Sequence, residues 1–122
     1  MQNDKEKFKK EFIGRLIEFS IDIIKFCNTL RKNKNYYFLA DQLARSATSV
    51  GANVVEAKSA SSKRDYINYF QIALKSANET KYWLILCEKL DDINGNEKGL
   101  FKECTEIANV LDSSVLTMKG KK

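Results

Sequence analysis

The sequence has 122 residues, of which 43% are hydrophobic and 30% are charged, a composition typical of one globular domain with a single core. It contains no apolar run of the ~18 residues that a membrane-spanning helix needs, and no apolar segment follows the charged N-terminus as in a secretory signal. We therefore expect a cytoplasmic protein with no membrane partner. The net charge of +5 favours contact with polyanions, although the Lys and Arg residues are spread along the chain.

The chain has no histidine and three cysteines, and both facts narrow its possible chemistry. The lack of histidine excludes Ser-His and Cys-His nucleophile pairs, HExxH zinc sites and the Glu-x-x-His motif of di-iron bundles. Cys27, Cys87 and Cys104 match neither a CxxC metal site nor a disulfide framework, and each lies on or beside an apolar line. We expect the cysteines to fill the core, and we expect neither a metal ion nor a cofactor.

A first helix is expected over residues 5–31. The residues of its main apolar line recur at steps of four and three: Phe12, Leu16, Phe19, Ile23, Phe26 and Leu30. A second apolar line runs beside it: Ile13, Ile17, Ile24 and Cys27. This double face is wider than one partner helix needs, so we expect contact with two neighbours, either both in the same chain or one in another subunit. Gly14 lies within this helix at a cost of about 1 kcal/mol relative to Ala.

A second helix is expected over residues 37–58, after the polar connection RKNKN. Its apolar line is Leu43, Ala47, Val50, Val54 and Ala57, and a polar line lies directly beside it: Gln42, Ser46, Ser49, Asn53 and Glu56. Most of these polar side chains are short, unlike the long Lys and Glu of a solvated face. Two interpretations follow: half-exposed residues at the rim of the core, or a satisfied polar seam against another helix or subunit. Gly51 is either tolerated in this helix or marks a close approach of another backbone.

A third helix is expected over residues 63–90, because Ser62 and Asp65 have the spacing of a capping box. Its apolar line is interrupted only at Thr80: Tyr66, Phe70, Ala73, Ala77, Leu84 and Cys87. A polar line accompanies it: Arg64, Asn68, Gln71, Lys75, Asn78 and Tyr82. Since this line contains two cations, we expect it to be solvated or to line a shared opening. We expect Trp83 to pack at a helix flank or an interface rather than to stack on a base.

A fourth helix is expected over residues 97–118, after a turn marked by Asn-Gly in residues 91–96 and before a basic tail, residues 119–122, that we expect to be disordered. The chain thus has four periodic helices, short polar connections, no strand-like alternation and no proline. These features predict a single all-α domain, an antiparallel up-down-up-down four-helix bundle.

The middle of the chain resembles a known family. DQLARSATSVGANVVEA and its continuation SSKRDYINYFQIALKSANE contain Gln-Leu-x-Arg, then Ser-hydrophobic-x-Ala-Asn-hydrophobic-x-Glu, a Ser-rich turn and Ala-x-x-Ser-x-x-Glu. This order resembles the four-helix-bundle family of the 23S rRNA intervening-sequence proteins, which includes the accessory variability proteins of diversity-generating retroelements. The resemblance is close over residues 36–90 and extends to the outer helices by pattern.

The resemblance implies a bundle that assembles into ring-shaped homopentamers. It also implies an association with RNA or DNA, because relatives are encoded within ribosomal RNA genes or work beside a reverse transcriptase, so a reverse transcriptase or another protein is a candidate partner. The chain has Ala44 where the family usually repeats the arginine of Arg45, and Ala57 where glycine usually follows Glu56. Prolines common before and within the second helix are absent. These departures concern a shared surface more than the fold.

An enzyme is the least favoured function. Glu56 and Glu79 could in principle serve as acid and base, but no nucleophile, phosphate-binding glycine loop or metal set accompanies them. We expect instead a structural polar network of Arg45, Asn53, Glu56 and Glu79, which holds the register between helices or subunits through charge-assisted hydrogen bonds.

The favoured function is that of a non-catalytic oligomeric bundle associated electrostatically with RNA or DNA. The candidate contacts form a first basic cluster of Arg31, Lys32 and Lys34 and a second basic cluster of Lys58, Lys63 and Arg64, at opposite ends of an up-down bundle. No RNP-type aromatic motif, zinc finger or helix-turn-helix is present, so we expect contacts with phosphates rather than bases. The alternative is a protein-interaction module or scaffold without nucleic-acid contact, which the double apolar face of the first helix fits equally well.

Overall fold

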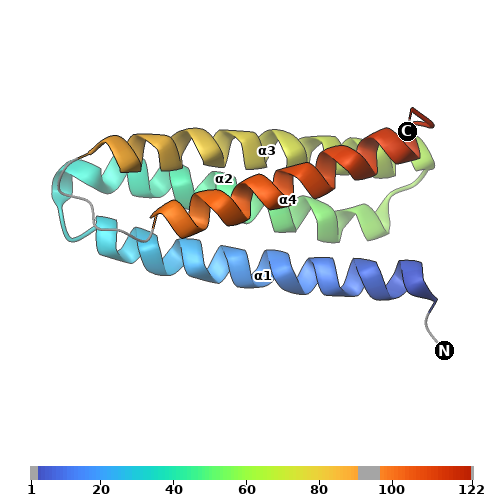
Figure 1. Cartoon of the computed structure of the whole chain (residues 1–122), viewed down its shortest axis with the longest axis horizontal. Coiled ribbons are helices and arrows are strands. Elements are labelled where there is room, and N and C mark those ends of the chain that lie inside the picture. Colours follow the sequence, from blue (N-terminus) through green and yellow to red (C-terminus); the bar gives the residue numbers. More distant parts are fainter. Residues whose placement is uncertain (1–2, 91–96, 122) are drawn as a thin grey trace.

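The computed structural model describes residues 3–90 and 97–121, which form four α-helices and no strand. The helices are α1 (Asp4–Leu30), α2 (Tyr37–Glu56), α3 (Lys63–Lys89) and α4 (Glu97–Met118). Successive helices run in opposite directions, so the predicted all-α, up-down-up-down four-helix bundle is confirmed (Figure 1). Each helix begins and ends within two residues of its expected range. The turn expected at residues 91–96 lies outside the described residues.

The starts of α1 and α3 are capped by side-chain hydrogen bonds. The Asn3 side chain accepts a hydrogen bond from the Glu6 N–H at 2.8 Å, and the Ser62 hydroxyl accepts one from the Asp65 N–H at 3.0 Å. The capping box differs from its usual form, because the Asp65 carboxylate accepts from the N–H of Ser61, at 3.1 Å, and not from that of Ser62. The start of α3 is therefore fixed by the residues that the sequence indicated, with a one-residue change of partner.

The basic tail is ordered as far as Lys121, contrary to expectation. Gly120 adopts a left-handed conformation, with φ of +72°, directly after α4. Its N–H donates to the carbonyl of Thr117, and the N–H of Lys121 donates to the carbonyl of Leu116. This pair of bonds is the Schellman arrangement, which satisfies carbonyl groups that the end of a helix would otherwise leave unpaired.

The core runs the length of the bundle and contains all three cysteines. The Sγ atoms of Cys27 and Cys104 lie 3.4 and 3.3 Å from the carbonyl oxygens of Ala40 and Ala77, their hydrogen-bond acceptors. Burial raises the pKa of Cys27 to about 11 and the pKa values of Cys87 and Cys104 to about 12, because a thiolate would be poorly solvated there. The prediction that the cysteines fill the core is confirmed.

Helix α1 packs mainly against α2 and less extensively against α4, whereas α3 packs closely against both α2 and α4. Of its second apolar line, Cys27 is buried and Ile13 is half-buried, but Ile17 and Ile24 are exposed, as is the neighbouring Ile21. The helix therefore has two neighbours in its own chain and still presents apolar side chains to solvent. Within the described ranges, no helix is long and apolar enough to cross a membrane.

Gly51 faces α1, but the two helices are not so close there that only glycine fits. A Cβ atom added to it would lie 3.5 Å from Cβ of Leu16 and 3.9 Å from Oγ of Ser20. These distances are ordinary van der Waals contacts. Of the two interpretations of Gly51, the structure favours a tolerated glycine.

Candidate nucleic-acid interface

The two basic clusters lie at opposite ends of the bundle. The first cluster lies at the connection between α1 and α2, and the second lies around the connection between α2 and α3 (Figure 1). Within the first cluster, Nη2 of Arg31 donates to Oδ1 of Asp41 at 3.0 Å, so this guanidinium is already paired with a carboxylate. Lys32 and Lys34 are exposed. The first cluster therefore offers fewer free cations than its sequence suggests.

The second cluster is exposed, and in the described part of the chain none of its residues forms an ion pair. Both ends of the chain lie at this end of the bundle (Figure 1). They bring further cations to the same place: Lys5 and Lys9 line one hollow together with Lys58 and Lys63, and Lys119 lines an adjoining hollow together with Lys63 and Arg64. We call this end of the bundle the basic end.

The hollow beside Lys119 has polar walls and a volume of about 850 Å³. It is lined by the first residues of the helix-three polar line, Arg64, Asn68 and Gln71. The carboxylate of Asp65 also lines this hollow, but it accepts hydrogen bonds from Ser61. Cations next to amide groups and a serine hydroxyl form a surface that can contact phosphate oxygens.

Lys5, Lys9 and Lys119 belong to this surface although they lie outside both predicted clusters. The predicted topology already implied their position, because an up-down bundle of four helices places both chain ends next to the connection between its second and third helices. These residues are far from Lys58 and Lys63 in the sequence, but the topology places them at the same end of the bundle.

The polar line of α2 contacts α3 at its centre. Oγ1 of Thr80 donates to Oγ of Ser46 at 2.9 Å, and the hydroxyls of Ser49 and Ser76 share a hydrogen bond of 3.0 Å. Nδ2 of Asn53 donates to both the carbonyl oxygen and Oγ of Ser49, at 2.9 and 3.0 Å. We call this set the α2–α3 seam. Of the two interpretations of the polar line, a satisfied seam against another helix is confirmed for its central residues.

The expected network of Arg45, Asn53, Glu56 and Glu79 does not form within one chain. Arg45 and Glu56 are exposed and make no ion pair with any described residue. Glu79 is exposed and accepts a hydrogen bond from Nε1 of Trp83 at 3.2 Å, and only Asn53 joins the seam. Long charged side chains beside a bundle core reach solvent readily. The hydrogen bonds that join α2 to α3 are therefore made by short hydroxyl side chains and not by the expected charged ones. Contacts of these residues between subunits stay a prediction.

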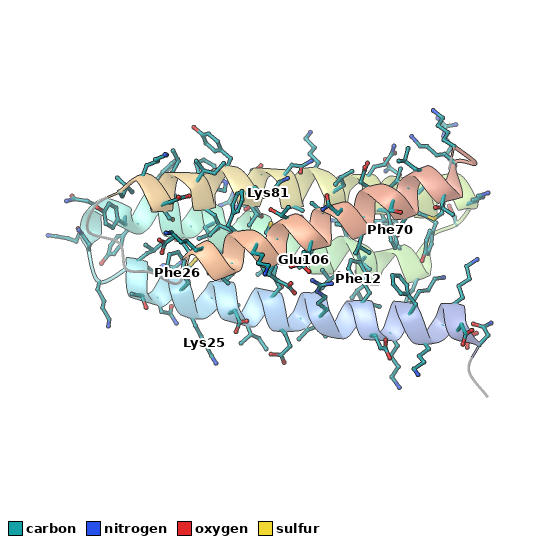
Figure 2. The ribbon with its side chains drawn as sticks, in the orientation of Figure 1. Phe12, Lys25, Phe26, Phe70, Lys81 and Glu106 are labelled. Carbon is teal, nitrogen blue, oxygen red and sulfur yellow. The ribbon has the colours of Figure 1, made fainter. Side chains whose placement is uncertain are left out.

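Two further features concern the flanks of the bundle. Trp83 packs at the α2–α3 flank, edge-on to Phe38 with ring centroids 6.1 Å apart, as expected. Arg15 of α1 forms an ion pair that the sequence pattern does not predict: its Nε and Nη2 lie 2.7 and 2.6 Å from the two carboxylate oxygens of Glu103 on α4. Glu106, on the side of α4 that faces α1, accepts from the same guanidinium at 3.2 Å (Figure 2). These hydrogen bonds raise the pKa of Arg15 further above its usual range.

Across residues 3–90 and 97–121, no group of three or more His, Cys, Asp or Glu side chains is placed to bind a metal ion. The polar hollow at the basic end is lined mainly by cations, amides and hydroxyls.

The sequence model of the family described as 23S rRNA-intervening sequence protein matches residues 9–113. Among solved structures, the chain is similar to a crystal structure, at 1.70 Å resolution, of a protein with unknown function from the S23 ribosomal protein family of Bacteroides thetaiotaomicron. The two are 34% identical with a TM-score of 0.81, and the similarity covers 88% of this chain and 96% of that one. No curated protein matches the chain significantly.

Proposed function

The chain belongs to the 23S rRNA-intervening sequence protein family, and from this premise we propose that it is a non-catalytic, oligomeric accessory protein that binds RNA or DNA through phosphate contacts at its basic end. The observation that carries the proposal is the convergence of Lys5, Lys9 and Lys119 on the second basic cluster. Unpaired cations on one surface attract polyanions, and binding to phosphates releases condensed counterions.

The proposal predicts weak binding that depends steeply on salt and little on sequence. Each phosphate contact contributes about 0.7 to 0.9 to the slope of log affinity against log salt concentration. Replacing Lys58, Lys63 and Arg64 together by Gln should therefore lower that slope by about 2 for single-stranded RNA and DNA alike. Fluorescence anisotropy titrations at several salt concentrations measure this slope.

A matched control removes the same amount of charge elsewhere. Lys25, Lys32 and Lys34 are exposed and lie on α1 or at the opposite end of the bundle, and Figure 2 shows Lys25 pointing away from the other helices. Their joint replacement by Gln should lower affinity only slightly. Equal losses for the two triple variants would argue against a localised site, and no binding to either polymer at low salt would overturn the proposal.

We also propose that copies of the chain associate, as a pentamer by its family resemblance. This assembly is supported by the exposed apolar line of Ile17, Ile21 and Ile24, whose spacing places the three side chains on one face of α1. A ring of copies would multiply the positive field of each basic end. Ile17→Glu with Ile24→Glu should dissociate the assembly in light scattering coupled to size exclusion. A monomer at high micromolar concentration of the unmodified chain would contradict it.

The second candidate function is a protein-interaction module without nucleic-acid contact. It is favoured by the same exposed isoleucines and by Phe38, which is 66% exposed at the start of α2. A partner such as a reverse transcriptase would cover such residues. The anisotropy titrations separate the two candidates, because an interaction module would show no salt-dependent binding to either polymer.

A further inference from the structure

A cavity of about 980 Å³ opens at the basic end, beside the polar hollow, with which it shares Ser62 and Lys63. Its walls come from the first half of α1, the end of α2 with the following turn, the start of α3 and the second half of α4. This volume lies at the upper end of the range of about 300–1,000 Å³ typical of small-molecule sites. The charge and chemistry of its walls indicate which class of ligand it can bind.

Two aromatic pairs on different helices line the cavity. On α1, the rings of Phe8 and Phe12 are stacked with centroids 6.0 Å apart and an interplanar angle of 11°. On α3, the rings of Tyr66 and Phe70 are stacked with centroids 5.1 Å apart and an angle of 23°. Phe12 and Phe70 are labelled in Figure 2, on two helices of the same half of the bundle. Phe8 remains 53% exposed, so part of this aromatic surface is open to an incoming group.

Apolar side chains form much of the remaining wall: Ile13, Val54, Ala57, Ala60, Val110 and Met118. The rest of the wall is cationic or carries short hydrogen-bonding groups. Lys5, Lys9, Lys58 and Lys63 line the cavity, and none of the described residues around it is Asp or Glu. Nζ of Lys9 lies 5.1 Å from the centroid of the Tyr66 ring, which places a positive charge directly over one aromatic wall. Helix α4 contributes the amide of Asn109 and the hydroxyls of Ser114 and Thr117.

We propose that this cavity takes one unstacked base of single-stranded RNA or DNA, with the neighbouring phosphates held by lysines at its mouth. The inference rests on the proposed function and specifies the form of nucleic acid that the basic end recognises. A base has a π face for the aromatic walls and polar edges for the α4 side chains, and its backbone carries the anionic charge that the lysines require. An uncharged aliphatic chain would leave the four lysines without a counter-charge, and a duplex keeps its bases inside the stack.

The test compares two end-labelled single-stranded DNA octamers in anisotropy titrations: one with eight thymines and one with the same backbone but abasic at every position. Stacking on aromatic side chains is sequence-tolerant, so one base type serves as the probe. The unmodified chain should bind the thymine octamer about 10-fold more tightly than the abasic one, within the range for a single stacked base. Both octamers should show the same salt slope.

Two variants alter the cavity without removing charge. Ser114→Leu narrows it without adding an aromatic face, and Tyr66→Leu keeps apolar volume but removes one aromatic face, while thermal unfolding verifies that each variant is folded. Both should lower the preference for the thymine octamer to about 1-fold and leave abasic binding unchanged. Phe38→Leu, at the opposite end of the bundle, is the matched control and should keep the 10-fold preference.

The outcomes separate this inference from the proposed function. Equal affinity of the unmodified chain for both octamers, or a preference that survives in both cavity variants, overturns the base site and leaves phosphate binding intact. Loss of the preference in Phe38→Leu alone moves the stacking to the other end and likewise overturns the inference. Absence of binding to either octamer at low salt overturns the base site together with the proposed function.

Discussion

The interface between α2 and α3 and the interface between α1 and α4 close the bundle by different means. The first contains buried side chains and the hydroxyls of Ser46, Ser49, Ser76 and Thr80, which bond one another across it. The second has fewer contacts, is tied by the partly exposed Arg15 and Glu103, and borders the cavity at the basic end. Helix α1 is thus held mainly through α2, and its contact with α4 is the less extensive one. A bundle with a regular topology can therefore differ in how extensively its neighbouring helices pack.

The largest expected difference between the two sides concerns apolar side chains. Leu84 of α3 is 1% exposed, so Leu84→Ala should lower the free energy of unfolding by about 2–5 kcal/mol, because a cavity remains. Ile17 of α1 is 53% exposed, so Ile17→Ala in the dissociated chain should cost less than about 0.5 kcal/mol. Denaturant unfolding at low protein concentration measures both. Similar costs would mean that Ile17 is buried in the folded chain as Leu84 is.

The α2–α3 seam provides the next test. Thr80 is fully buried and bonds Ser46, so Thr80→Val, which keeps the shape and removes the hydroxyl, should cost about 1–2 kcal/mol. Combining it with Ser46→Ala should cost less than the sum of the two single changes, because the hydroxyls depend on each other. Strict additivity in this double-mutant cycle would show that the hydrogen bond contributes nothing to cohesion.

Gly14 allows the comparison to be sharpened by stabilising the weaker side. A Cβ atom at this position meets nothing within 4 Å, so Gly14→Ala should stabilise α1 by about 1 kcal/mol through helix propensity alone. Amide hydrogen exchange should show greater protection in α1 and little change in the middle of α3. Equal gains in both helices would mean that α1 opens only when the whole bundle unfolds.

The smallest effect is expected for the ion pair that joins α1 to α4. Both side chains are about one third exposed, at 35% for Arg15 and 33% for Glu103, so water and salt weaken their attraction. Arg15→Met should cost about 0.5 kcal/mol at low salt and less at 1 M salt. A large cost that persists at high salt would indicate that this pair, rather than apolar contact, holds α1 in place.

The helices and their order could be predicted from the sequence because apolar residues repeat at helical spacing over each one, as from Phe12 to Leu30. The polar line of α2 was found in the same way, but its partners were not. Thr80 looked like an interruption of the α3 core and proved to be the residue that Ser46 contacts. Helical spacing identifies a face, and it does not say which residues of another helix meet that face.

The expected charged network failed for a related reason. Steps of four and three average 3.5 residues, whereas a straight helix has 3.6 residues per turn, so such a line rotates by about 20° every seven residues. Glu56, at the end of this line, is exposed, whereas Ser49, seven residues earlier, shares a hydrogen bond with Ser76 of α3. The pair of Arg15 and Glu103, 88 residues apart, carries no local signal at all.

Because both chain ends lie at the basic end, any segment joined to them would begin beside Lys5 or Lys121 (Figure 1). A polyhistidine tag there would place imidazoles next to the lysines, and an acidic extension would compete with nucleic acid for the same cations. Fluorophores and surface attachments belong instead at the connection between α1 and α2, where Lys34 is exposed at the far end of the bundle. The position of a label on this chain should thus affect measured binding as much as the choice of nucleic acid does.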